Sequence, residues 1–132
     1  MAGTFKFELV SPERVLMSAD AEQAMLPALE GDMTVFPSHA PVVITLRPGV
    51  LDISMVGSKS RIFVHSGFAE ILPDRVTVLA EKAFDMADID AAYIAAELKA
   101  AEEQLAAAVD DDAVFMASRA VEQLRLLGGK AA

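Results

Sequence analysis

Residues 30–49, with the sequence EGDMTVFPSHAPVVITLRPG, place two Gly and three Pro among short apolar runs. Each Pro fixes its own φ angle and favours extended backbone at the preceding residue, while each Gly can adopt the positive φ values that chain reversals need. A helix cannot continue through this spacing. The segment therefore predicts short strands that are separated by tight turns.

The same turn chemistry extends over the first part of the chain. All six Pro lie between Pro12 and Pro73, and apolar and polar residues alternate in residues 4–9, 61–65 and 76–80. Alternation with a period of two is typical of half-buried strands. This part of the chain is therefore expected to form an all-β sandwich or barrel of about ten short antiparallel strands, not an array of βαβ units.

The hydrophobic period changes after the last Pro. Apolar residues then recur every three or four positions, which is typical of amphipathic helices. The two stripes are Ile94, Leu98, Ala101, Leu105 and Val109, then Val114, Ala117, Val121 and Leu124. We predict two domains, a β-sandwich over residues 1–84 and a C-terminal antiparallel two-helix hairpin over residues 85–132.

Acidic residues and glycines mark the expected ends of these helices. Asp88 is the predicted N-cap of the first helix, because an Asp side chain accepts hydrogen bonds from the free N–H groups of the first turn. One Asp of the run 110–112 can cap the second helix. Gly128 and Gly129 are expected to end it.

The composition limits the classes of function. The chain has 132 residues, a formal net charge of −9 and no Cys. Excess carboxylates repel nucleic acid, so direct DNA or RNA binding is not expected. Without Cys there is no thiolate nucleophile, disulfide or cysteine-ligated zinc. The sequence shows neither a secretion signal nor a run of about 18 apolar residues, so we expect no membrane span.

Motifs for catalysis or metal binding are scarce. Residues 57–60, GSKS, lack the adjacent Gly-Lys pair of a phosphate-binding loop and are expected to form a hairpin turn. His39 has no second His at metal-binding spacing. Glu30 and Asp32 are better explained as a solvated acidic turn than as an acid–base pair. We predict no catalytic residue, no metal site and no cofactor.

Residues 37–51 carry more apolar side chains than one face of a small sandwich needs, among them Val42, Val43, Ile44 and Leu46. Two explanations are open at this point. A partner covers part of the segment, or the strand is buried on both faces.

Several blocks of this sequence are similar to the epsilon subunit of bacterial F-type ATP synthases. In the first half of the β domain the matching residues are Glu30-Gly31, Pro37, His39-Ala40-Pro41 and Pro48-Gly49. In the second half they are residues 66–70, SGFAE, and 76–83, VTVLAEKA, and Ile89-Asp90 falls where the first helix of that family's hairpin begins. The resemblance covers nearly the whole chain.

The resemblance implies a non-catalytic subunit of the rotor's central stalk, peripheral to the cytoplasmic face of the bacterial inner membrane. It implies the gamma subunit and the polar loops of the c-ring as partners of the sandwich, and the catalytic alpha and beta subunits as contacts of an extended hairpin. The membrane is reached only through the complex. By position, the c-ring loop corresponds to Glu30, Gly31 and Asp32, and the gamma-facing side to His39, Val42, Val43 and Thr45.

The resemblance is weaker at the positions that sense ATP. The ATP-sensing form of the family begins its hairpin with Ile-Asp-x-x-Arg-Ala, whereas here Tyr93 replaces the Arg that follows Asp90. Arg119 agrees in the second helix, but Gln123 stands where a second Arg would help to hold the triphosphate. Because charge-assisted contacts to phosphate are strong, losing two cations should leave ATP binding weak or absent. The acidic hairpin is likewise expected to inhibit ATP hydrolysis weakly or not at all.

Two other classes of function remain alternatives on the residues alone. One is an unrelated adaptor built from a sandwich and a hairpin. The other is a small hydrolase that uses Glu30 with His39.

The alanine content of the hairpin predicts that the β domain folds without it. Sixteen of the 50 residues from Ala83 onward are Ala. A buried methyl group contributes about 0.8 kcal/mol, against about 1.5–3 kcal/mol for a fully buried Leu or Phe. A fragment of residues 1–84 should therefore unfold cooperatively in thermal denaturation and protect its strand amides from hydrogen exchange. An unfolded fragment would contradict the two-domain interpretation.

Overall fold

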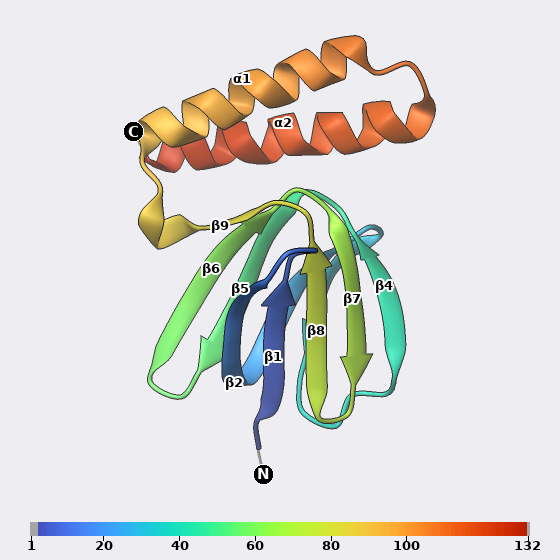
Figure 1. Ribbon diagram of the computed structural model, residues 1–132, viewed down its shortest axis with the longest axis vertical. Coiled ribbons are helices and arrows are strands. Elements are labelled where there is room, and N and C mark those ends of the chain that lie inside the picture. Colours follow the sequence, from blue (N-terminus) through green and yellow to red (C-terminus); the bar gives the residue numbers. More distant parts are fainter. Residues whose placement is uncertain (1–2, 132) are drawn as a thin grey trace. The chain divides into compact units, whose positions relative to one another are not determined.

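The structure is a computed structural model that describes residues 3–131. The described residues separate into two compact units between Met86 and Ala87. Among the described residues the first unit contains nine strands, and the second contains two α-helices (Figure 1). The strands are β1 (Phe5–Val10), β2 (Val15–Ala28), β3 (Gly31–Val35), β4 (Val42–Leu46), β5 (Gly49–Met55), β6 (Ser58–Val64), β7 (Gly67–Leu72), β8 (Arg75–Ala80) and β9 (Ala83–Asp85). The helices are the short 3-10 helix η1 (Met86–Asp88) at the division, then α1 (Ala91–Ala107) and α2 (Asp111–Ala131).

The strands form one folded-over sheet around β2. This 14-residue strand pairs antiparallel with β1, β3 and β5, and with β4 at Ala28–Leu46. The sheet order is β1-β8-β7-β4-β2-β5-β6-β9, and the additional β1–β2 pairing closes the first five strands of this order into a ring. The predicted all-β sandwich followed by a helical hairpin is confirmed, with nine strands in the described residues where about ten were expected.

One pairing differs from the expected all-antiparallel sheet. β1 and β8 run parallel, with Phe7 beside Val76 and Leu9 beside Val78. A parallel pair needs a long connection, and here residues 11–74 provide it. The alternating pattern identified both strands but carried no information about their relative direction.

The turn residues lie between strands as the sequence indicated. Ser11 and Pro12 separate β1 from β2, Pro48 separates β4 from β5, and Pro73 and Asp74 separate β7 from β8. Gly57 has a φ of 79° in the turn between β5 and β6. The GSKS segment was expected to be the turn, but only Gly57 lies in it, because Ser58, Lys59 and Ser60 already belong to β6.

The core of the first unit is made by the alternating residues of its strands. In β1, Phe5, Phe7 and Leu9 are buried while Lys6 is exposed. Other strands contribute Leu26, Leu46, Leu51, Ile53, Ile62, Ile71, Val76 and Val78 to the same cluster. Each fully buried Leu, Ile or Phe side chain contributes about 1.5–3 kcal/mol, so this cluster is the main source of the unit's stability.

The two helices pack along the predicted stripes, with corrections at the ends. Ile94 and Ala101 of α1 and Ala117, Val121 and Leu124 of α2 are buried. Val109 was assigned to the first stripe, but it lies in the connection between the helices and is 94% exposed. The stripe was extended one turn too far because α1 ends at Ala107.

The α1 cap and the end of α2 also need correction, while the expected cap of α2 within residues 110–112 is confirmed. Asp90, not Asp88, caps α1, because its carboxylate accepts a hydrogen bond from the backbone N–H of Tyr93 at 2.8 Å, while Asp88 lies in η1. The α2 cap is Asp110, whose carboxylate accepts from the N–H of Ala113 at 2.7 Å. Gly128 and Gly129 do not end α2, which continues to Ala131, since Gly lowers helix propensity without forbidding the helix.

Gly67 provides a test of the sheet packing. Its φ is 159°, and a Cβ atom there would overlap with the backbone carbonyl oxygen of Leu79 on β8. Gly67→Ala should lower the free energy of unfolding by about 2–3 kcal/mol, because the neighbouring strand must shift. Gly3→Ala is the matched control, since nothing lies within 4 Å of a Cβ at that position. Equal midpoints for both variants in chemical denaturation would show that β7 and β8 are not packed this closely.

Candidate docking surface

The acidic turn forms the tip of the β2–β3 hairpin. Ala28 pairs with Gly31, so Leu29 and Glu30 are the two turn residues. Gly31 has a φ of 145°, a value that favours glycine at this reversal. Leu29 is 40% exposed and Glu30 is exposed. The tip therefore presents one apolar and one acidic side chain to its surroundings.

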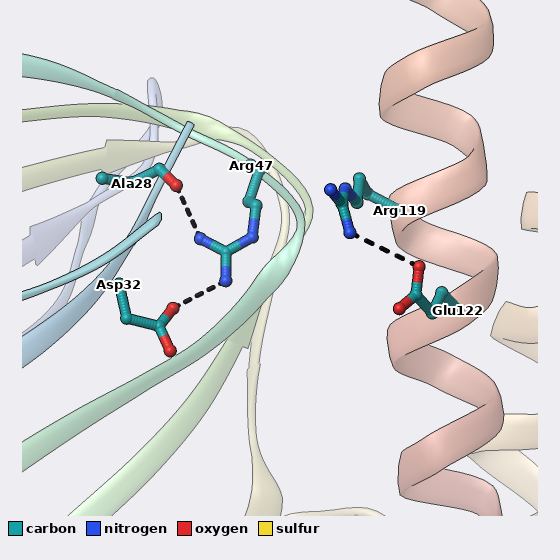
Figure 2. A network of polar contacts seen from close by, with 5 residues as sticks. All are labelled: Ala28, Asp32, Arg47, Arg119 and Glu122. Atoms are coloured by element: carbon teal, nitrogen blue, oxygen red, sulfur yellow. Dashed lines mark hydrogen bonds and ion pairs between the residues drawn. The ribbon is translucent and has the colours of Figure 1, made fainter. Parts of the chain in front are cut away.

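Arg47 joins this hairpin to the end of β4 (Figure 2). Its guanidinium donates one hydrogen bond from Nη1 to the carbonyl oxygen of Ala28 and one from Nη2 to Oδ1 of Asp32, both at 2.6 Å. The Arg47 side chain is only 16% exposed. Because Ala28 lies on β2 and Asp32 on β3, one side chain is bonded to both strands of the hairpin.

Two backbone hydrogen bonds support the same junction. The N–H of Arg47 donates to the carbonyl oxygen of Pro27, and the N–H of Leu29 donates to the carbonyl oxygen of Thr45, both at 2.9 Å. The turn is therefore fixed to the β4 end through its main chain as well as through the guanidinium.

The two carboxylates near the tip have different environments. Asp32 is paired with Arg47, and its side chain remains 54% exposed. The Glu30 carboxylate makes no hydrogen bond or ion pair with any side chain or backbone that the structure describes. The sequence placed Glu30, Gly31 and Asp32 together correctly, since all three lie at one hairpin. It missed the role of Arg47, whose position inside an otherwise apolar segment was the available signal.

The proposed gamma-facing residues lie on and before β4. Val43 is 67% exposed and Val42 is 37% exposed, and Thr45 is exposed as well. His39 is half-buried, and its Nδ1 lies 2.7 Å from the carbonyl oxygen of Ala40. The open alternative of a strand buried on both faces is therefore wrong for β4.

The exposed apolar surface extends from β4 across the neighbouring strands. Phe68 of β7 pairs with Thr45 and with Leu79 of β8, and Phe68 and Leu79 are 56% and 43% exposed. Val43 lies two residues from Thr45 on the same strand. We call Val43, Phe68 and Leu79 the β4–β7–β8 patch.

The described residues offer neither a metal-binding cluster nor a membrane-spanning helix. No group of three His, Cys, Asp or Glu among them could hold a metal ion. None of the described helices is both long and apolar enough to cross a bilayer.

Comparison with known families identifies the chain. The profile of the ATP synthase, Delta/Epsilon chain, beta-sandwich domain matches residues 4–86.

The chain belongs to this ATP synthase delta/epsilon family.

Relatives in this family match over almost the full chain. The ATP synthase epsilon chain of Mesorhizobium japonicum is 45% identical over 130 residues, which cover 98% of this chain and 96% of the relative. The ATP synthase epsilon chain of Rhodospirillum rubrum is 46% identical over 112 residues, or 84% of each chain.

Solved structures share the fold at lower identity. A chain of the Euglena gracilis mitochondrial ATP synthase, in a structure of OSCP, F1 and c-ring, matches with a TM-score of 0.74 and 20% identity, covering 98% of this chain and 82% of that one. A chain of the central stalk and c-ring of the Tetrahymena thermophila mitochondrial ATP synthase matches with a TM-score of 0.65 and 11% identity, covering 98% of both chains. The order of sandwich and helical hairpin is thus shared with these chains.

The four residues at the positions of the family's ATP-sensing form make contacts within the hairpin or are at least partly exposed. Asp90 is used as the α1 cap, and Tyr93 is 42% exposed. Arg119 lies 3.5 Å from the Glu122 carboxylate (Figure 2). Its guanidinium carbon is also 5.2 Å from the centre of the Phe115 ring. Gln123 is half-buried. Arg119 is thus the one cation of this set, and a carboxylate already neutralises part of its charge.

This arrangement predicts very weak ATP binding. We expect a dissociation constant above about 1 mM, equivalent to less than about 4.1 kcal/mol, because a triphosphate would meet one partly neutralised cation. The variant with Tyr93→Arg and Gln123→Arg should bind more tightly by at least about tenfold. Isothermal titration calorimetry on both proteins measures this, and micromolar affinity of the unmodified chain would contradict it.

Proposed function

We propose that this chain is a non-catalytic rotor subunit of the central stalk of a proton-translocating ATP synthase, where it couples the c-ring to the gamma subunit. The observation that carries the proposal is the match to relatives named ATP synthase epsilon chain over 98% of the chain at 45% identity. In this role the chain works by binding two partners at once. It is peripheral to the cytoplasmic face of the bacterial inner membrane and reaches the membrane through the complex.

The hairpin tip is the proposed contact with the polar loops of the c-ring. It is exposed, carries the carboxylate of Glu30 and is fixed to β4 through Arg47. Carboxylates suit a partner loop with basic side chains, and a turn held in one conformation loses less entropy on docking than a free loop does.

The β4–β7–β8 patch, together with Val42, Thr45 and His39, is the proposed contact with the gamma subunit. Large apolar side chains exposed side by side on one sheet face are typical of a protein interface. Antiparallel pairing of β4 with β7 and of β7 with β8 makes this face a continuous hydrogen-bonded surface, which suits the transmission of torque.

We propose that the helical hairpin has no role beyond regulation, and that its ATP sensing and its inhibition of hydrolysis are weak or absent. The substitutions at Tyr93 and Gln123 and the Arg119–Glu122 pair support weak or absent ATP sensing. The hairpin is acidic, with basic side chains only at Lys99, Arg119, Arg125 and Lys130 after Ala83. Two of these, Arg119 and Arg125, pair with carboxylates of the hairpin, which supports weak contacts with acidic loops of the alpha and beta subunits.

A hydrolase that uses Glu30 with His39 finds no support in the geometry. The His39 ring is engaged with the adjacent Ala40 carbonyl, and no described polar contact joins it to Glu30. The adaptor alternative would require the family match to be unrelated to function.

Val43→Asp tests the proposed gamma contact. Because Val43 is 67% exposed, the substitution should leave folding intact, while a carboxylate buried in an apolar interface should reduce copurification of the gamma subunit by about tenfold or more. Val56→Asp is the matched control, since Val56 is 75% exposed in the turn between β5 and β6. Quantitation of gamma after affinity purification of each full-length variant gives the result. Equal recovery of the gamma subunit with both variants would show that β4 does not contact gamma.

A further inference from the structure

The contact between Arg47 and the β2–β3 hairpin assigns different roles to the two carboxylates near its tip. Asp32 lies 2.6 Å from the guanidinium, and the same guanidinium donates to Ala28 on the opposite strand. The guanidinium is thereby bonded to both strands just behind the turn. Glu30, at the turn itself, carries the carboxylate that the described contacts leave available.

We propose that Arg47 is a positioning residue that fixes the Leu29–Glu30 turn for docking, that Glu30 supplies the contacting carboxylate, and that Asp32 acts through Arg47. The partner is a basic loop of the c-ring, so this inference rests on the proposed rotor function. The assignment differs from the one based on sequence position, in which Glu30, Gly31 and Asp32 together form the loop that contacts the c-ring and both carboxylates can pair with it.

Burial explains why the pair holds the turn. The Arg47 side chain is 16% exposed, and its hydrogen bond to the Ala28 carbonyl forms in a partly buried place where water competes less, while the Asp32 carboxylate stays 54% exposed. The bond to Asp32 joins two charged groups, which makes it stronger than a neutral hydrogen bond. Truncation of Arg47 would leave the Ala28 carbonyl without this donor and would release the Asp32 carboxylate. The turn would then keep only two backbone hydrogen bonds, from Leu29 to Thr45 and from residue 47 to Pro27, as its attachment to the end of β4.

Truncation of Arg47 distinguishes a direct contact by Asp32 from a positioning role of Arg47, because the two predict opposite changes in binding affinity. If Asp32 contacts a basic loop directly, Arg47→Ala frees that carboxylate and binding becomes tighter. If Arg47 positions the turn, the same substitution weakens binding, because the turn is no longer held in the docking conformation.

The experiment measures binding of full-length variants to ATP synthase depleted of its own epsilon chain. Arg47→Ala, Asp32→Asn and Glu30→Gln are each expected to weaken binding by about tenfold, which corresponds to about 1.4 kcal/mol. The double variant Arg47→Ala/Asp32→Asn should bind with the same affinity as each single variant, within about twofold. The effects do not add because the two residues act as one unit. Arg47→Lys should recover part of the affinity, since it keeps the charge for Asp32 but cannot bridge to Ala28 in the same way.

Asp52→Asn is the matched control. Asp52 forms an ion pair of 3.3 Å with Arg61 across β5 and β6, and both side chains are well exposed. Loss of a carboxylate in this pair should change binding by less than about twofold, because exposed ion pairs contribute little.

Hydrogen exchange distinguishes positioning from a general loss of stability. In Arg47→Ala and Asp32→Asn the Leu29 amide should exchange faster while amides of β1 and β8 keep their protection. In Glu30→Gln the Leu29 amide should exchange as in the unmodified chain. If Arg47→Ala fails to fold, Asp32→Asn and Glu30→Gln still carry the test, because both of these side chains are exposed.

Failure of the inference and failure of the proposed function give different results. If the unmodified chain does not bind the depleted synthase, the rotor function is wrong. If the unmodified chain binds and Arg47→Ala leaves affinity unchanged or raises it, the rotor function stands and the positioning role is wrong. An unchanged affinity of Glu30→Gln, or additive effects of Arg47→Ala and Asp32→Asn, would also overturn the inference.

Discussion

The β unit depends on the pairing of both edges of β2. At Ala21 this strand lies between Phe5 of β1 and Met55 of β5, and at Ala24 it lies between Val35 of β3 and Ile53 of β5. Ala21 and Ala24 are both fully buried. A shift of β2 by one residue would move its buried side chains to the opposite face and would break the register on both edges together. The position of the β2–β3 hairpin, and hence of the acidic turn, follows from this register.

Local sequence patterns predicted the parts of the fold that local physics decides. Alternation in residues 4–9 and 76–80 identified strands, and Pro48 and Pro73 marked connections, because side-chain period and backbone restriction are properties of neighbouring residues. The parallel direction of β1 and β8 was missed because it depends on the path of the 64 residues between Val10 and Arg75. Gly128 and Gly129 were assigned to a helix end, and there the tertiary context outweighs propensity.

The candidate site was predicted less completely than the fold. The sequence brought Glu30 and Asp32 together because they are neighbours at one turn. The partner of Asp32 is 15 positions away, at Arg47, and only the closing of β4 against the end of β2 brings it near. The exposure of Phe68 and Leu79 in register with Thr45, on the same sheet face as Val43, was likewise not predicted, because it depends on which strands are adjacent in the sheet. Contacts between distant strands thus decide which side chains are available to a partner.

The parallel pairing of the first strand with the eighth has a consequence for the order of events during synthesis. β1 leaves the ribosome first, but its β8 edge stays open until residues 75–80 have been translated. The ring of strands therefore cannot close on a partial chain, and contacts of such long sequence separation form slowly. During this interval the backbone groups on that edge of β1 remain without their strand partner, so an open sheet edge is a property of every incomplete form of this unit.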